Sequence, residues 1–150
     1  MGSRLDCKKE LFYSYLAGFL DGDGCIAIKF ESSKTNKLGY RARVRVSFTQ
    51  HRLRRSVLDF FHKNIKSGVV SEYDHNNMAE YVIHDQKIVK ELLINIKPYV
   101  YVKPKQLNLA LKLLILKESG YSKSSIKQMF NIYKEVGSLN HYQKKSNLTP

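Results

Sequence analysis

The chain has 150 residues, 43% of them hydrophobic, and carries 26 Lys and Arg against 13 Asp and Glu, a net charge of +13. This length and apolar content predict one folded domain over residues 1–150 and exclude a disordered chain. No apolar run approaches the roughly 18 residues of a membrane helix, and charged residues interrupt the N-terminus where a signal peptide would be apolar. We therefore expect an intracellular protein with no membrane partner, whose two cysteines stay reduced.

The positive charge is unevenly distributed along the chain. Six of the seven arginines lie between Arg41 and Arg55, and lysines dominate from residue 86 onward. A basic excess of this size predicts a polyanionic partner, most often nucleic acid. A surface that only keeps the protein in solution would scatter both residue types, so the clustering favours nucleic-acid binding.

The first part of the chain has the pattern of a helix followed by a hairpin. Apolar residues at helical spacing predict a helix over residues 8–21, namely Leu11, Phe12, Tyr15, Leu16, Phe19 and Leu20. Residues 25–30 and 40–50 alternate apolar and polar positions, as strands with one buried face do, around the polar turn 32–39. In the second strand, Ala42, Val44, Val46 and Phe48 are expected to face the core, and Arg41, Arg43, Arg45 and Ser47 the outside.

The rest of the chain repeats this pattern and adds helices. We expect a helix over 53–65, then a hairpin with strands 68–73 and 79–84 around a turn-rich tetrad. Further helices are expected over 86–96, 104–118 and 122–136. The predicted order is αββαββαα, an α+β fold with a core at about 8–118 and a C-terminal helical extension over 119–150.

Residues 16–24, with the sequence LAGFLDGDG, carry the strongest chemical signal. Gly18 and Gly22 lie four residues apart on one helix face beside Ala17, and small residues at this spacing let two helix backbones approach closely. Asp21 and Asp23 stand at the helix C-terminus, where the helix dipole disfavours a carboxylate by roughly 0.3–1 kcal/mol. A hard cation such as Mg²⁺ would offset that cost. The alternative is an Asp-Gly turn that only ends the helix.

This segment resembles the LAGLIDADG motif, matching at Leu16, Ala17, Gly18, Asp21, Asp23 and Gly24. The chain is similar to the single-motif, homodimeric LAGLIDADG homing endonucleases encoded in organellar group I introns. Further shared features are Thr49-Gln50, Arg54-Arg55 and Lys103-Pro104-Lys105-Gln106. The resemblance implies an αββαββα core whose saddle-shaped antiparallel sheet has helices on one face. It also implies an organellar location (chloroplast or mitochondrion).

The same resemblance implies an activity and its site. A homodimer would cut both strands of a long, roughly palindromic DNA target and leave 3′ overhangs, without a small-molecule cofactor. Asp23 and the Gly22 carbonyl would bind Mg²⁺, one Asp23 coming from each subunit, and metals roughly 3.5–4 Å apart would clamp the reacting oxygens. Ca²⁺ is expected to bind without supporting cleavage. The dimer interface would comprise Ala17, Gly18, Asp21 and Gly22, with Asp21 otherwise structural at the helix end.

Three more residues receive site roles from the resemblance. Gln50 would position the attacking water, Lys103 would contact the scissile phosphate region, and Arg54 would lie at the periphery of the active site. The alternatives are a strand-end hydrogen bond for Gln50, a solvated loop charge for Lys103 and a helix-surface charge for Arg54.

The outward face of the two hairpins is the expected DNA-binding surface. Alternate residues of a strand stand about 6.8 Å apart on one face, so the arginines at 41, 43 and 45 form a row, and arginine reads guanine in the major groove. These cations would repel one another unless an anion binds. Acidic members of the face would either accept from cytosine or hold an arginine in place. The predicted contacts are Lys29, Glu31, Ser33, Arg41, Arg43, Arg45, Ser47, Ser71, Tyr73 and Glu80.

Two other functions stay open at this point. One is an intron maturase, an RNA-binding splicing cofactor on the same fold, and the other is a cleavage-inactive DNA-binding protein that uses the same sheet. The joint presence of Asp23, Gln50 and Lys103 favours the nuclease.

Overall fold

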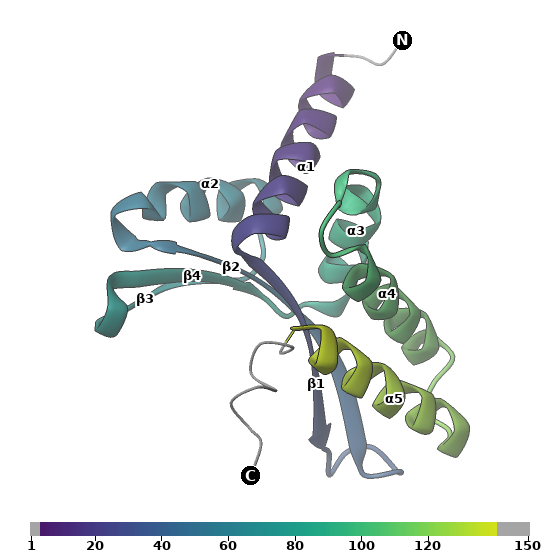
Figure 1. The fold of residues 1–150 in the computed structure, drawn as a ribbon. Helices are drawn as coiled ribbons and strands as arrows, with labels where there is room; N and C mark the ends of the chain where they lie inside the picture. Colours follow the sequence, from purple (N-terminus) through teal and green to yellow (C-terminus); the bar gives the residue numbers. More distant parts are fainter. Residues whose placement is uncertain (1–3, 141–150) are drawn as a thin grey trace.

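The computed structural model describes residues 4–140, which form helices and strands in the order αββαββαα (Figure 1). Short 3₁₀ turns, η1 (Arg52–Arg54), η2 (His75–Asn77) and η3 (Lys97–Tyr99), connect some of them. The elements are α1 (Arg4–Asp23), β1 (Gly24–Ser32), β2 (Tyr40–His51), α2 (Arg55–Ile65), β3 (Val69–Tyr73), β4 (Met78–Ile83), α3 (Gln86–Ile96), α4 (Pro104–Glu118) and α5 (Lys123–Asn140). The predicted α+β class and element order are confirmed.

The four strands form one antiparallel sheet in the order β1-β2-β4-β3. Strand β1 pairs with β2 from Gly24↔Phe48 to Ser32↔Tyr40, whereas β4 pairs with β2 only between Val46 and His51. The β1–β2 hairpin therefore extends well past the second hairpin (Figure 1).

The edge of β2 that β4 leaves open is closed by side chains. The Val44 N–H donates to Oε1 of Gln86 at 2.9 Å, and Nε2 of Gln86 donates back to the Val44 carbonyl at 2.8 Å. Two residues further along, the Ala42 N–H donates to the Tyr121 hydroxyl at 3.4 Å. Gln86 thus forms the two hydrogen bonds that a residue of a neighbouring strand would form with Val44. These bonds cover a strand edge that could otherwise pair with another chain.

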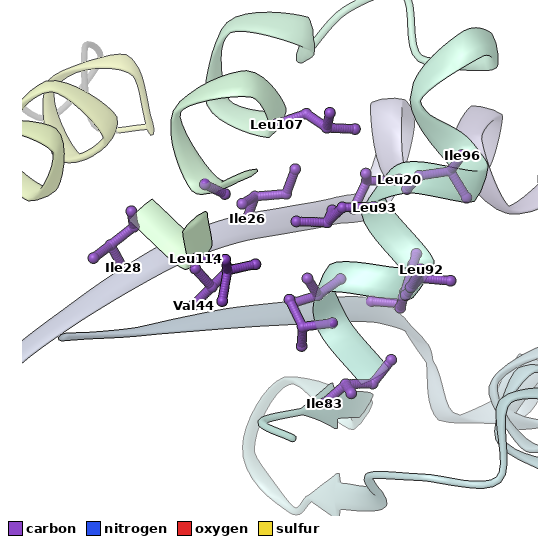
Figure 2. Packing of buried hydrophobic residues seen from close by; sticks show 14 of the residues in the cluster. Leu20, Ile26, Ile28, Val44, Ile83, Leu92, Leu93, Ile96, Leu107 and Leu114 are labelled. Carbon is purple, nitrogen blue, oxygen red and sulfur yellow. The ribbon is translucent and has the colours of Figure 1, made fainter. Parts of the chain in front are cut away.

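The core lies between the sheet and the helices that cover one of its faces. The predicted inward residues of β2 are all buried. Figure 2 shows Ile26 of β1 near Leu93 of α3 and Leu107 of α4, and Val44 of β2 beside Leu114 of α4. Helix α5 contributes Met129, Ile132 and Val136 to the same core. A single domain over residues 1–150 stays a prediction, since 1–3 and 141–150 lie outside the described residues.

Helix α1 begins at Arg4, earlier than the predicted residue 8, and differs from its prediction in two further respects. It continues to Asp23, and β1 begins at the next residue, Gly24, where a β-carbon would lie 2.7 Å from the Cα atom of Leu20. Its apolar residues also do not share one buried face, because Leu11 and Tyr15 are 69% and 54% exposed. Within residues 4–140, no helix has both the length and the apolar content to cross a membrane.

Candidate metal centre and nucleic-acid interface

The end of α1 meets the end of β2 at Asp23. Nε2 of Gln50 donates to Oδ2 of Asp23 at 3.5 Å, so the structure brings together two residues that lie 27 positions apart. The Thr49 hydroxyl donates to the Asp23 backbone carbonyl at 3.1 Å. No separate role was predicted for Thr49. Its position before Gln50, with a short hydroxyl side chain, was the available signal.

The side chain of Lys103 lies at the same C-terminal end of α1. Its Nζ donates to the backbone carbonyls of Leu20 at 2.8 Å, Asp21 at 3.1 Å and Gly24 at 2.7 Å. The last carbonyls of a helix have no partner within it, and a cation there is stabilised by the helix dipole. The alternative of a solvated loop charge is therefore wrong. Each proton of the ammonium has a backbone partner in this arrangement, so a contact with phosphate would require Lys103 to give up part of this cap.

Asp21 explains why a second carboxylate stands at this helix end. Its Oδ2 accepts the Tyr101 N–H at 2.8 Å and its Oδ1 accepts the Lys103 N–H at 3.2 Å. Asp21 thus fastens the loop before α4 to α1, while the Lys103 ammonium returns to the α1 backbone. Asp21 therefore has a structural role, as expected, but it binds a distant loop and does not only end the helix. Its place in the dimer interface stays a prediction.

The chemistry of Asp23 suits a cation. Its carboxylate is exposed, and in the described part of the chain it makes a single, long hydrogen bond. The neighbouring Gly22 is also exposed and carries a backbone carbonyl. No group of three or more His, Cys, Asp or Glu gathers anywhere in residues 4–140. Because Mg²⁺ takes six oxygen ligands, one chain supplies only part of a metal site, and further oxygens must come from a second molecule or from water.

Arg54 lies apart from this group. It is the last residue of η1 and is exposed, and its side chain forms no hydrogen bond or ion pair within the described residues. With His51 and Leu53 it lines a shallow hollow beyond the end of β2. Its role at the periphery of the active site stays a prediction.

One face of α1 is open. A β-carbon built on Gly18 or on Gly22 would meet no atom within 4 Å. The exposed Leu11 and Tyr15 stand seven and three residues before Gly18, so they continue the same face toward the N-terminus. Ala17 is fully buried in its own subunit, and its predicted place in a dimer interface is therefore wrong. Helical spacing alone did not separate the two apolar faces of this helix.

Carboxylates form ion pairs with the arginines of the predicted row. Glu31 accepts from Arg41 at 3.0 Å and from Arg43 at 3.2 Å, and Glu80 accepts from Arg45 at 2.9 Å and from the Tyr73 hydroxyl at 2.8 Å. These hydrogen bonds, above all that from Arg41, lower the pKa of Glu31. These ion pairs relieve the repulsion expected among the arginines before any DNA binds. Of the two roles proposed for the acidic residues, the free protein shows the one that holds arginines in place.

Strand register places most of the predicted contacts on this outer face. Lys29 lies opposite Arg43, and Ser71 lies opposite Glu80, while Ser33 follows the end of β1 and bonds to Thr35 at 3.1 Å. Ser47 is an exception because it is only 4% exposed. It lies in the middle of the sheet between Cys25 and Val82, where neighbouring side chains cover it. Alternation gave the correct face for Ser47 but the wrong exposure.

Comparison with known proteins adds to this geometry. A family model described as LAGLIDADG endonuclease matches residues 16–115. DNA endonuclease I-CreI of Chlamydomonas reinhardtii is 32% identical over 103 residues, which cover 69% of this chain and 62% of I-CreI. DNA endonuclease I-CvuI of Chlorella vulgaris is 29% identical over 105 residues, covering 70% of this chain and 65% of I-CvuI. The chain thus spans less than two thirds of either relative.

Solved structures share the fold. The homing endonuclease I-CvuI, crystallised in complex with its target in the presence of Ca, superposes with a TM-score of 0.79 at 25% identity, covering 88% of this chain and 83% of that one. The homing endonuclease I-TnaI superposes with a TM-score of 0.77 at 24% identity, covering 91% and 95%.

Proposed function

The chain belongs to the LAGLIDADG endonuclease family, and on that premise we propose that it is a homing endonuclease that cuts a specific double-stranded DNA site as a Mg²⁺-dependent homodimer. The observation that carries the proposal is the junction of α1 and β2. There an exposed Asp23 meets Gln50 at the end of the strand that bears the arginine row.

A second copy of the chain would complete the metal centre. Each chain offers Asp23 and the Gly22 carbonyl but, within its described residues, no cluster of further acidic ligands. The open face of Gly18 and Gly22 allows another helix to come close, and contact there would also remove Leu11 and Tyr15 from water. In a two-fold dimer the same face of each subunit meets the other, so the two Asp23 carboxylates would lie near each other.

Each residue at this junction has a part in the proposed reaction. When bound, Mg²⁺ would polarise a phosphoryl oxygen and activate water. Asp23 and the Gly22 carbonyl would hold the ion, and Gln50, already directed at Asp23, would orient the attacking water. Thr49 and Lys103 fix the backbone that presents these oxygens. We expect Ca²⁺ to occupy the site without supporting cleavage.

The outer face of the sheet would bind the major groove. Arginine distinguishes guanine through two hydrogen bonds in a fixed geometry, and Glu31 and Glu80 restrain the guanidinium groups in advance. Two identical subunits require a long, roughly palindromic target. In keeping with the family resemblance, we extend the proposal to short 3′ overhangs and to an intracellular, organellar location.

The test is cleavage of a plasmid library of randomised palindromic sites, with sequencing of the cut ends. We expect cutting with Mg²⁺ and none with Ca²⁺. Asp23→Asn should abolish cutting but keep the gel shift with the selected site, because the arginine row is unchanged. Cutting by Asp23→Asn at the parental rate would refute the metal role. A gel shift without any Mg²⁺-dependent product would indicate a cleavage-inactive DNA-binding protein, and preferential binding of intron RNA would indicate a maturase.

A further inference from the structure

Lys117 lies at the edge of β2 that the side chains of Gln86 and Tyr121 cover. Nζ of Lys117, near the end of α4, donates to Oε1 of Gln86 at 3.1 Å, the same oxygen that accepts the Val44 N–H. The amide nitrogen of Gln86 is already committed to the carbonyls of Val44 and His84. Gln86 is therefore held in place by the backbone on both sides, and it fixes Lys117 beside the projecting half of β2.

Lys117 has no acidic partner among the described residues. The next residue, Glu118, pairs with Lys90, and Glu31 of the outer face is shared by Arg41 and Arg43. Nε of Arg43 is moreover buried without a hydrogen-bond partner in the described chain. A partly buried cation without a counter-ion is unfavourable unless an anion arrives. Lys117 therefore carries an unpaired positive charge at this edge, whereas Arg43 keeps its ion pair with Glu31 and has only one unpartnered N–H.

The surroundings of Lys117 are open enough for a ligand oxygen. A hollow of about 260 Å³ lies between the start of α3 and the end of α4. Its wall is mostly apolar carbon, and the residues that line it are Gln86, Lys87, Lys90, Leu114, Lys117 and Glu118.

We propose that Lys117, oriented by Gln86, is a phosphate-binding residue that contacts one phosphodiester of the DNA backbone beside the arginine row. The proposal rests on the proposed function, because the phosphate belongs to the DNA that the outer face binds. Phosphate contacts of this kind fix a protein's register on the duplex and carry no sequence information. Lys117 would thus hold the projecting hairpin at a set position in the groove.

Protonation gives the proposal a distinctive signature. Burial, with smaller contributions from Arg43 and Arg41, lowers the pKa of Lys117 to about 8. A phosphate at Nζ would favour the charged ammonium, so DNA binding would take up a proton where the free protein has partly lost it. The affinity should therefore fall as the pH rises above about 8. The flanking arginines stay charged throughout, and burial lowers the pKa of His84 below 6.5, outside this window.

The experiment compares wild type, Lys117→Met and Lys112→Met, the last removing an exposed lysine from the same helix. Affinity for a duplex carrying the selected site is measured from pH 7 to 9.5 at fixed salt, and as a function of salt at pH 7. We expect wild type and Lys112→Met to lose up to about tenfold in affinity per pH unit above 8, and Lys117→Met to lack this loss. The salt slope of Lys117→Met should be smaller by about 0.9, one phosphate's worth of released counterions.

Three outcomes would count against the proposal in different ways. Matching pH and salt profiles for Lys117→Met and Lys112→Met would overturn it while leaving the proposed function intact. If inorganic phosphate, at constant ionic strength, protected the Lys117 ammonium in NMR titration as well as DNA does, the site would bind free oxyanions and the assignment to DNA would be wrong. If wild type bound no DNA at any pH, the proposed function itself would fail. Circular dichroism and thermal unfolding of each variant verify that it is folded.

Discussion

Replacing Lys103 by Met separates two roles that this lysine could have at the cleavage centre. Met keeps an unbranched apolar stem of similar length but removes the ammonium. In the structure that ammonium caps the carbonyls of Leu20, Asp21 and Gly24. A lysine that only contacted the scissile phosphate would be dispensable for folding, whereas a lysine that caps α1 is not.

The expected loss of stability follows from the contacts. A hydrogen bond from a charged donor contributes about 1.5–3 kcal/mol, and a partly buried cation at a helix C-terminus contributes up to about 2 kcal/mol. These contributions describe the same three contacts and do not add. Water can also reach some of the exposed carbonyls in the variant. We therefore expect Lys103→Met to lower the free energy of unfolding by about 2–4 kcal/mol.

Urea unfolding at fixed protein concentration measures this loss, and single-turnover cleavage measures the effect on the site. Cleavage should fall together with stability, because the cap holds the backbone that bears Gly22 and Asp23, while DNA affinity should stay within a few fold. Lys105→Met, an exposed lysine at the start of α4, is the matched control and should change neither quantity. Unchanged stability of Lys103→Met with lost cleavage would refute the capping argument and assign Lys103 to the phosphate instead.

Further changes test other parts of the structure. Gly18→Leu should leave the fold intact but block close approach of a second helix, so analytical ultracentrifugation should find a monomer that does not cut DNA. The control Asn131→Leu, on the exposed face of α5, should stay dimeric. A dimeric, active Gly18→Leu variant would contradict the helix-to-helix interface. Glu80→Gln frees Arg45 and Tyr73, so discrimination between target variants, measured by competition binding, should drop several-fold, while Glu135→Gln on α5 should match wild type. The hydrogen bonds to Glu31 lower its pKa in the folded state, so its ion pairs stabilise the protein above the ordinary glutamate pKa of about 4.3 and cease to do so as the pH falls through the lowered value. Unfolding curves of wild type and Glu31→Gln should accordingly converge only in that acid range, and a constant difference at every pH would show that Glu31 does not titrate as argued.

The sequence predicted best those features that depend on neighbours along the chain. Alternation identified the buried and outward residues of β2, and the start of α4 at Pro104 was found from a residue that fits the first turn of a helix. The family resemblance assigned Gln50 and Asp23 to one site, but their hydrogen bond was not predicted, since nothing in the spacing brings together residues 27 positions apart.

What the sequence missed depends on contacts across the fold. Nothing near Lys103 shows that its ammonium reaches a helix end about 80 residues earlier, nor that Asp21 binds back to the same loop. Ser47 is covered by the strands on either side, so its exposure could not be read from its own strand. The exposure of Leu11 and Tyr15 could not be predicted, because apolar residues have the same spacing in a helix with two apolar faces as in a helix with one broad apolar face.

The length of β2 has a consequence for how such a protein can change over time. One strand carries Arg41 near its start and Gln50 near its end, about 30 Å apart at the usual rise per residue. A one-residue insertion between them would turn every later side chain to the opposite face and would misplace Gln50, whereas the turn before Tyr40 lies outside this span. New target preferences are therefore expected to arise by substitution along β2, and changes of length to accumulate in residues 33–39.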